Sequence, residues 1–359
     1  MNEIVRMHYE THPYPHFGYG ASVRTCDTYA LNLEALWARG NGELPPPDGQ
    51  RILLAGCGSF SPYPTSVANP RADIVALDLS QANLRRARIH SLLHGRRNVR
   101  YLQGDLLDQA TAPGPFSFID SFGVLHHLEE PLAGLKALEQ RLAPGGIIRI
   151  MVYSRHGRQE DESIRRALRL LGIRNLDGLR RLARRARKGS RFATYLSTAP
   201  EASHASGLAD ALLHPRVTTF SADALLKLCT DAGLQPLLFA HAGAGLPVAE
   251  EVRRLRQAEH ENTLCTNFTL YLGRSGDAPP LPDPGRLLLN PALKSSVSRL
   301  QFGTLRISPK LGRPNPPLDR TARAFLRRFV TPQPMDRLNR EELQRARIFQ
   351  DALFLVAIR

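Results

Sequence analysis

The sequence is poor in the features that mark membrane-spanning or disulfide-stabilised proteins. Its 359 residues include only four cysteines, which are widely spaced and form no C-x-x-C pair: Cys26, Cys57, Cys229 and Cys265. This spacing predicts reduced thiols and neither a disulfide framework nor a zinc site. No stretch reaches the ~18 uncharged apolar residues of a membrane helix, and the N-terminus lacks the apolar segment of a secretory signal. We therefore expect a cytoplasmic protein without a membrane span.

Acidic residues are also scarce, because 33 Asp and Glu face 48 Lys and Arg, which gives a net charge of +15. The excess is concentrated between Arg155 and Arg191, where thirteen basic residues face four acidic ones. A basic stretch of this kind suggests either a solvated helix face or an RNA-binding surface. In the first reading Leu168, Leu171, Leu179 and Leu182 turn inward to pack. No aromatic residue interleaves the arginines before Phe192, although base stacking would use them, which favours the solvated face.

Short apolar runs alternate with helical patterns in the first half of the chain. Runs buried on both faces are typical of parallel strands, and the alternation predicts a doubly wound α/β sheet with right-handed crossovers. The expected strands are Arg51–Ala55, Ile74–Leu77, Val99–Leu102, Phe116–Ser121 and Ile147–Tyr153, and the expected helices include Thr28–Arg39, Gln81–His94 and Pro131–Leu142.

The chain divides into three expected regions. Residues 1–45 form a leader or lid, residues 46–274 form the α/β domain, and residues 275–359 form a C-terminal extension that opens with a proline-rich stretch. Within the domain, residues 155–215 interrupt the rhythm, and their spacing predicts two basic amphipathic helices. A helix capped by Ser221 follows, and a last helix starts at Asn339, where Glu342 completes a capping-box pattern.

The strongest local signal is the turn Gly56-Cys57-Gly58 after the first strand. Glycine allows positive φ and close approach of a ligand, although a tight turn without a ligand is the alternative. Asp78, which ends the second strand, can accept hydrogen bonds from both ribose hydroxyls of a nucleoside, and it can also cap the next helix. A dinucleotide is disfavoured, because Ser61 stands where the third glycine of that pattern would be. A nucleoside without phosphates fits better.

Five successive motifs together resemble those of class I S-adenosylmethionine-dependent methyltransferases. They are GCG at 56–58, LDLS at 77–80, GDLLD at 104–108, DSFGVLHHLEEP at 120–131 and LAPGGIIRIMVYS at 142–154. The resemblance implies a Rossmann-like seven-stranded sheet whose last strand is antiparallel, with Pro236–Ala240 and Phe268–Leu272 as strands six and seven. It also implies S-adenosylmethionine as the cofactor.

The resemblance assigns the cofactor site residue by residue. Gly56, Cys57 and Gly58 would lie by the methionine part, Asp78 would hold the ribose, and Leu79 would pack on the adenine. Asp105 would bond the adenine amino group with Leu106 beside it, and Ser121 and Phe122 would border the methyl group. Two positions depart from the family pattern, since Leu54 stands where an acidic residue is frequent and Phe60 stands where a third glycine is frequent.

His126 and His127 follow the fourth strand, at the edge where acceptors bind in this family. A neutral imidazole there could take a proton from the acceptor, which makes both residues candidate catalytic bases. The alternative, which we favour, is a structural turn. Methyl transfer can proceed mainly by holding the nucleophile in line with the methyl group, so a base is optional.

The leader is rich in aromatic residues and histidine, and the resemblance makes Tyr9 and Tyr14 candidate lid residues. A metal site built from His8, His12 and His16 would need one helix across all three, which Pro13 and Pro15 prevent. We therefore expect no metal. The tetrad that starts at Asn315 resembles an amide-methylating motif of nucleic-acid methyltransferases, but it lies after the seventh strand, and we interpret it as a loop.

These observations favour an enzyme that moves a methyl group from S-adenosylmethionine to an O, N or C acceptor. A small molecule is the favoured acceptor, since the sequence holds no recognisable RNA-binding module. The alternatives are a tRNA or rRNA methyltransferase that uses the basic segment Arg155–Arg191, and a non-catalytic cofactor-binding module. A protein acceptor is also open.

Overall fold

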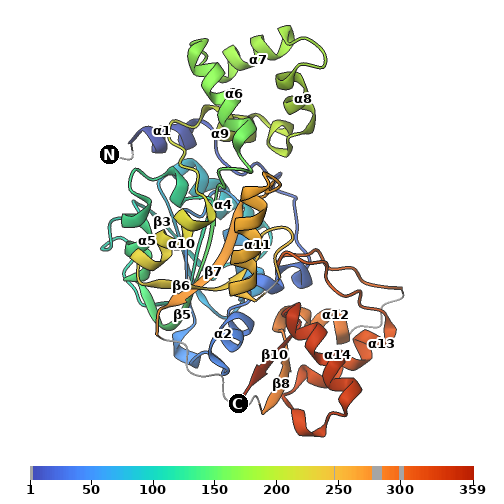
Figure 1. Cartoon of the computed structure of the whole chain (residues 1–359). Coiled ribbons are helices and arrows are strands. Elements are labelled where there is room, and N and C mark those ends of the chain that lie inside the picture. Colours follow the sequence, from blue (N-terminus) through green and yellow to red (C-terminus); the bar gives the residue numbers. More distant parts are fainter. Residues whose placement is uncertain (1–2, 246, 277–284, 299–302) are drawn as a thin grey trace.

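The computed structural model describes residues 3–245, 247–276, 285–298 and 303–359. A central α/β layer carries the helical insertion at one end and the C-terminal extension at the other (Figure 1). The chain starts at helix α1, which lies beside the insertion. The proline-rich stretch that opens the extension falls almost wholly outside the described residues.

Seven strands form the central sheet, in the order β3-β2-β1-β4-β5-β7-β6. Strand β7 runs antiparallel to both β5 and β6, whereas the other neighbours are parallel. The predicted fold class is therefore confirmed. The strands are β1 (Arg51–Ala55), β2 (Asp73–Asp78), β3 (Val99–Gln103), β4 (Phe116–Phe122), β5 (Leu142–Val152), β6 (Leu234–Phe239) and β7 (Phe268–Arg274).

Helices flank this sheet on both faces. They are α2 (Leu33–Asn41), α3 (Pro62–Ala68), α4 (Gln81–Leu93), α5 (Pro131–Glu139), α10 (Ala222–Asp231) and α11 (Val248–His260), with short 3₁₀ turns η1 (Thr25–Leu31) and η3 (Leu125–His127). Helix α1 (Glu3–Thr11) contacts α4 and lies beside the insertion. The predicted helix at Thr28–Arg39 is divided into η1 and α2 at Asn32. The Asn32 carboxamide oxygen accepts the Ala35 N–H, and its nitrogen donates to the Ala68 carbonyl, so a tertiary contact fixes the break.

Alternate side chains of each strand reach opposite faces of the sheet, as the pleat requires. Ile52 and Leu54 of β1 belong to the apolar cluster that includes α2 and η1, whereas Leu53 and Ala55 belong to the cluster that includes α5, α10 and α11. Because both faces are covered, the carboxyl edge of the parallel strands is left for a ligand.

The insertion after β5 holds more helices than the two that the sequence predicts. They are α6 (Gln159–Leu170), α7 (Leu176–Arg185), α8 (Arg191–Thr198) and α9 (Ala205–Leu213). Leu168 and Leu179 are buried and Leu182 packs against the same small cluster, but Leu171 is 63% exposed. The inward orientation expected for Leu171 was wrong, because α6 ends at Leu170 and the helical periodicity no longer applies to Leu171.

The C-terminal extension contains a second sheet, in the order β10-β8-β9. Its elements are β8 (Arg286–Leu289), α12 (Lys294–Ser298), α13 (Arg320–Arg327), β9 (Gln333–Pro334), α14 (Arg340–Asp351) and β10 (Leu355–Ile358). The predicted capping box at Asn339 and Glu342 is present. Phe354 packs edge-on against Tyr29 of η1, so the extension shares an apolar cluster with the sheet. The tetrad at Asn315 is a loop whose carboxamide accepts a hydrogen bond from the Tyr29 hydroxyl.

Within the described residues, no helix is both long enough and apolar enough to cross a membrane.

Candidate functional site

The turn after β1 is built from two glycines in the left-handed region, Gly56 at φ 76° and Gly58 at φ 58°. The Gly56 and Cys57 N–H groups both donate to the Leu77 carbonyl at the end of β2, which ties the turn to the neighbouring strand. A Cβ at Gly56 would come within 2.4 Å of Val124, and a Cβ at Gly58 within 2.7 Å of the Tyr14 carbonyl. Only glycine therefore fits at either position.

Asp78 ends β2 directly beside this turn and is 7% exposed. One carboxylate oxygen accepts the Gly58 N–H at 2.7 Å, and the other accepts the Ser80 N–H at 2.9 Å and the Asn83 amide at 3.3 Å. Burial raises the pKa of Asp78 above its usual value, and the bonds to Ser80 and Gly58 oppose that rise. Since Ser80 caps α4, Asp78 does not need to be the cap.

A cavity of about 270 Å³ opens along the carboxyl edge of the sheet. Eight of the nine sequence-predicted cofactor residues line it: Gly56, Cys57, Gly58, Asp78, Leu79, Asp105, Leu106 and Phe122. The ninth, Ser121, is fully buried beside the lining residue Phe122, and its hydroxyl makes no hydrogen bond with the described residues. The candidate lid residues Tyr9 and Tyr14 and the candidate base His127 also line the cavity, whereas His126 does not.

The leader is held beside the cavity by hydrogen bonds that involve Glu10 and Tyr14. Both carboxylate oxygens of Glu10 accept N–H groups from the first turn of α4, and the Tyr14 N–H donates to the Asn83 carboxamide. The Ser59 N–H donates to the Tyr14 carbonyl. Burial raises the pKa of the Tyr14 hydroxyl to about 12. The leader therefore covers the glycine turn at Gly58.

Asp210 of helix α9 forms the centre of the opposite end of the cavity. It is 3% exposed and accepts the Tyr9 hydroxyl at 2.8 Å and the Tyr153 hydroxyl at 3.3 Å. Burial, followed by the charge of Asp210 and the hydrogen bond to it, raises the pKa of Tyr9 well above its ordinary value. Asp210 thus connects the leader, strand β5 and the insertion.

His127 lies beside this carboxylate, with its Nε2 4.0 Å from Asp210 Oδ1. Its Nδ1 is 2.8 Å from the Arg216 carbonyl. A carbonyl can only accept, so Nδ1 carries the proton and Nε2 keeps a free lone pair. Burial lowers the pKa of His127, with Asp210 opposing that shift, so the ring is neutral at neutral pH.

His126 occupies a different environment from its neighbour. It is fully buried, stacks on Tyr153 with ring centroids 3.8 Å apart, and has no hydrogen bond from either ring nitrogen within the described residues. Burial lowers the pKa of His126 well below its ordinary value. Because it does not line the cavity, its catalytic assignment has no support in the geometry.

One group of side chains in the described residues has the spacing of a metal site, namely His8, Asp210 and His214. The three histidines of the leader are not that group, and α1 ends at Thr11, before both prolines. His214 Nδ1 accepts the Arg216 N–H at 3.1 Å. In the neutral ring Nε2 therefore carries the proton, and neither nitrogen offers a free lone pair to a metal.

Among the lining residues that sequence reasoning did not assign to the site are Tyr153, Arg158 and Asp210. Tyr153 is the last residue of the predicted strand Ile147–Tyr153, and this was a usable signal. Asp210 is the only acidic residue between positions 202 and 222, in an otherwise apolar and basic stretch, which was a weaker signal. Arg158 was indistinguishable from the other arginines of the basic segment.

Replacing Gly58 by alanine should weaken S-adenosylhomocysteine binding as well as stability, because the new Cβ would press on the Tyr14 carbonyl and displace the leader. Gly95 is a matched control, since it has a similar φ of 69° but nothing within 4 Å of its Cβ position. We expect Gly95→Ala to cost only the left-handed backbone strain, about 1–2 kcal/mol, with unchanged affinity. Calorimetry and thermal melting of both variants check this, and equal affinities in the two would contradict it.

Comparison with known families agrees with the fold and the glycine turn. A family profile described as a methyltransferase domain matches residues 29–238, which is more than half of the chain. The chain therefore belongs to this methyltransferase family, and its seven-stranded sheet with an antiparallel β7 is of the class I type.

Individual relatives match smaller parts of the chain. An uncharacterised protein of Synechococcus is 35% identical over 173 residues, which cover 48% of this chain and 42% of that protein. A ubiquinone biosynthesis O-methyltransferase of Aliivibrio fischeri is 28% identical over 109 residues, or 30% of this chain and 46% of that enzyme. The chain thus spans less than half the length of these curated relatives.

Among solved structures, PKMT2 from Rickettsia typhi matches 96% of this chain and 77% of its own, with a TM-score of 0.55 and 15% identity. The same protein has been solved in complex with AdoHcy and matches with a TM-score of 0.53. At this level of identity the likeness concerns the fold.

Proposed function

We propose that this protein transfers a methyl group from S-adenosylmethionine to a small-molecule acceptor. The observation that carries the proposal is one cavity whose two ends differ. The glycine turn and Asp78 lie at one end, and a buried carboxylate with a neutral histidine lies at the other. Membership of the methyltransferase-domain family supports methyl transfer as the reaction.

The residues at the first end fit a nucleoside cofactor. Asp78 already accepts three hydrogen bonds, and a carboxylate has about four lone-pair sites, so one site is open to a ribose hydroxyl. The buried Ser121 hydroxyl, beside the lining residue Phe122, lacks a protein partner in the described chain. Asp105 would bond the adenine amino group with Leu106 beside it, and Leu79 would pack on the adenine. When bound, S-adenosylmethionine supplies an electrophilic methyl group.

The residues at the second end would orient the acceptor and exclude water. Tyr9 and Tyr14 cover the cavity from the leader, and Phe122 borders it from the end of β4. His127 offers a lone pair at Nε2, and Asp210 can stabilise the imidazolium that forms when this atom takes a proton. We therefore assign the base to His127 and not to His126.

Calorimetry with S-adenosylmethionine, followed by transfer of a radiolabelled methyl group to a panel of phenols, alcohols, carboxylates and amines, tests the proposal. We expect one-to-one cofactor binding and transfer to at least one class of acceptor. Binding without transfer to any small molecule, RNA or protein acceptor would instead support a non-catalytic module. An absence of binding would refute the proposal.

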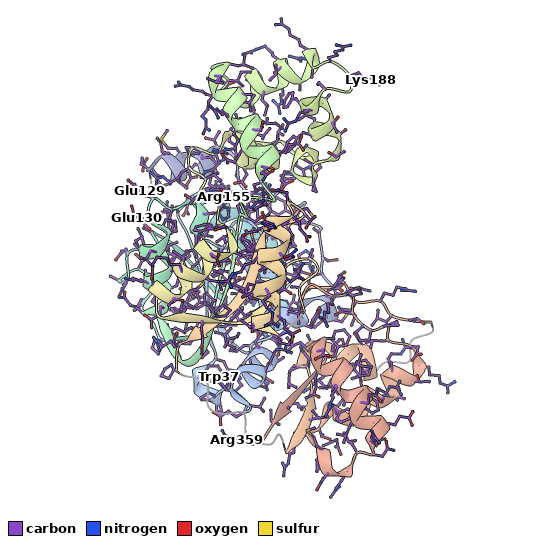
Figure 2. The ribbon with its side chains drawn as sticks, viewed as in Figure 1. Trp37, Glu129, Glu130, Arg155, Lys188 and Arg359 are labelled. Atoms are coloured by element: carbon purple, nitrogen blue, oxygen red, sulfur yellow. The ribbon has the colours of Figure 1, made fainter. Side chains whose placement is uncertain are left out.

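The basic insertion supports the small-molecule reading over the RNA reading. Eleven of its thirteen basic side chains are exposed, and Arg158 alone among them lines the cavity. Arg165 is buried and donates to the Ala211 and His214 carbonyls, which is a structural role. Figure 2 shows Arg155 at the root of the insertion and Lys188 at its outer end, away from the core. We propose that the exposed basic side chains of the insertion form a solvated helix face, and that the protein is cytoplasmic.

We expect binding to bulk tRNA and duplex RNA to be weak and non-saturable across a salt series. Each phosphate neutralised by the protein would add close to one unit to the slope of log affinity against log salt. A steep slope that flattens when Arg180, Arg181, Arg184 and Arg185 become alanine, together with methyl transfer to RNA, would establish the RNA methyltransferase instead.

A further inference from the structure

The acceptor end of the cavity holds a buried carboxylate, that of Asp210. The charge of the buried Arg165 also acts on Asp210, but the Arg165 guanidinium donates to the Ala211 and His214 carbonyls and pairs with Glu162. Within the described residues, no lysine or arginine forms an ion pair with Asp210, and His127, its one ion-pair neighbour at 4.0 Å, is neutral. Arg158 also lines the cavity, but both Asp161 and Glu201 bind its guanidinium, at 3.0 and 2.8 Å. Burying a carboxylate without a matching cation is costly unless a ligand supplies that cation.

We infer that Asp210 is the anchor of a cation subsite and that the acceptor is an amine. This inference rests on the proposed methyl transfer and specifies its substrate class. Three observations point to it: the buried carboxylate without an ion pair to a lysine or arginine of the described residues, the rings of Tyr9 and Tyr14 that line the same cavity, and the free lone pair of His127 beside them. Aromatic rings around a carboxylate are a suitable environment for an ammonium group.

A hydroxyl acceptor fits this end of the cavity less well. Deprotonation of a phenol or an alcohol creates negative charge on the oxygen, next to the carboxylate of Asp210. Like charges in a buried site disfavour each other, and Arg158, the one arginine among the described lining residues, already faces two carboxylates. An ammonium group instead gains from the same carboxylate, both by charge and by a hydrogen bond.

A metal ion is the other kind of cation to consider, because Asp210, His8 and His214 together have the spacing of a metal site. The hydrogen bond from the Arg216 N–H to His214 Nδ1 leaves the proton on Nε2, which opposes metal binding there. His8 and His214 are also absent from the cavity lining, so a metal among these three would lie behind Asp210 and not at the acceptor.

The reaction balances with the groups present. An alkylamine arrives protonated, since its pKa is near that of lysine, about 10.4. It donates to Asp210 and passes one proton to His127 Nε2. The neutral amine then forms the C–N bond with its lone pair, while the C–S bond of the sulfonium breaks and its electron pair stays on sulfur. The product leaves as a methylammonium ion, and His127 returns its proton to water.

The test compares 2-phenylethylamine with 2-phenylethanol, which share a skeleton and differ in charge. Both are titrated at pH 7 by calorimetry into the full chain saturated with S-adenosylhomocysteine. We expect the amine to bind roughly tenfold or more tightly than the alcohol in the wild-type protein. Asp210→Asn should remove this preference, whereas Asp177→Asn, at an exposed acid of the same insertion, should keep it.

Three results would overturn the inference. Equal binding of amine and alcohol by the wild type would do so without any variant, even if Asp210→Asn did not fold. Asp210→Asn could instead bind S-adenosylmethionine more weakly, bind neutral S-adenosylhomocysteine as before and keep its preference for the amine. That result would show that the carboxylate faces the sulfonium. Stoichiometric Zn²⁺ binding that is lost in both His8→Ala and His214→Ala would show a metal site.

Failure of the proposed function gives a different signature. S-adenosylhomocysteine binding is measured first in the same titration. If the cofactor product does not bind, the methyltransferase proposal fails, and the preference for amine over alcohol can still be measured on the ligand-free chain.

Discussion

Asp78→Ala should weaken S-adenosylmethionine binding by about tenfold to a hundredfold. A hydrogen bond to a charged group contributes roughly 1.5–3 kcal/mol, and every 1.4 kcal/mol is a factor of ten in affinity. The variant also leaves the Gly58 and Ser80 N–H groups without their carboxylate partner, which loosens the glycine turn. Calorimetry measures the affinity, and Asp73→Ala, at the exposed start of the same strand, is the matched control.

The negative charge of Asp78 should favour cofactor binding, but the same charge should lower the stability of the folded protein at neutral pH. The pKa of Asp78 is raised from 3.8 in the folded state, so the folded protein binds that proton more tightly than the unfolded chain. Its contribution to stability therefore falls as the pH rises from about 3.8 towards the raised value, and the whole penalty is present at neutral pH. Asp78→Asn removes this pH-dependent penalty, although its amide NH2 cannot accept one of the two backbone N–H bonds. We therefore expect the melting temperature of Asp78→Asn to gain on that of the wild type as the pH rises from about 3.8 to 7, with weaker cofactor binding. A folded Asp78→Ala variant with wild-type affinity would exclude Asp78 from the site.

The parallel sheet was predictable because its signals are local. Each strand of the first half is a short apolar run that ends at a turn, and β1 begins and ends at the predicted residues. Strand β5 is the exception, since it begins at Leu142 instead of Ile147. At the start of β5, Leu142 pairs with Phe116 of β4, and the register between β4 and β5 shifts after this pair. The early start of β5 therefore depends on its partner strand and not on its own sequence.

The cofactor end of the site was predictable for the same reason, since Gly56, Gly58 and Asp78 directly follow strands. The acceptor end was not. Asp210 enters the cavity only because helix α9 folds back over the sheet and meets Tyr9 of the leader, 201 residues away. No periodicity or short motif encodes a contact over that separation, because it depends on how the insertion packs. The same packing distinguishes His127 from His126, which look alike in the sequence.

His127→Ala should lower the turnover number by about 10²–10⁴-fold while leaving cofactor affinity intact, with whichever acceptor supports transfer. The expectation follows from the Nε2 lone pair of His127, a residue of the cavity lining, 4.0 Å from Asp210 Oδ1. The alternative is a purely structural role for His127, because its Nδ1–H also donates a hydrogen bond to the Arg216 carbonyl. In that case stability and activity would fall together.

His127→Asn separates the two accounts, because a carboxamide N–H can replace Nδ1–H towards the Arg216 carbonyl but cannot act as a base. We expect near-wild-type melting with the same loss of single-turnover rate, and no loss in His260→Asn at an exposed histidine of α11. The wild-type pH profile gives a second readout. Because burial lowers the pKa of His127, kcat/KM should hold from neutral pH to below 6.5 and fall only where Nε2 becomes protonated. A well-folded His127→Asn enzyme with a near-normal rate would remove His127 from the mechanism and leave positioning alone to account for transfer.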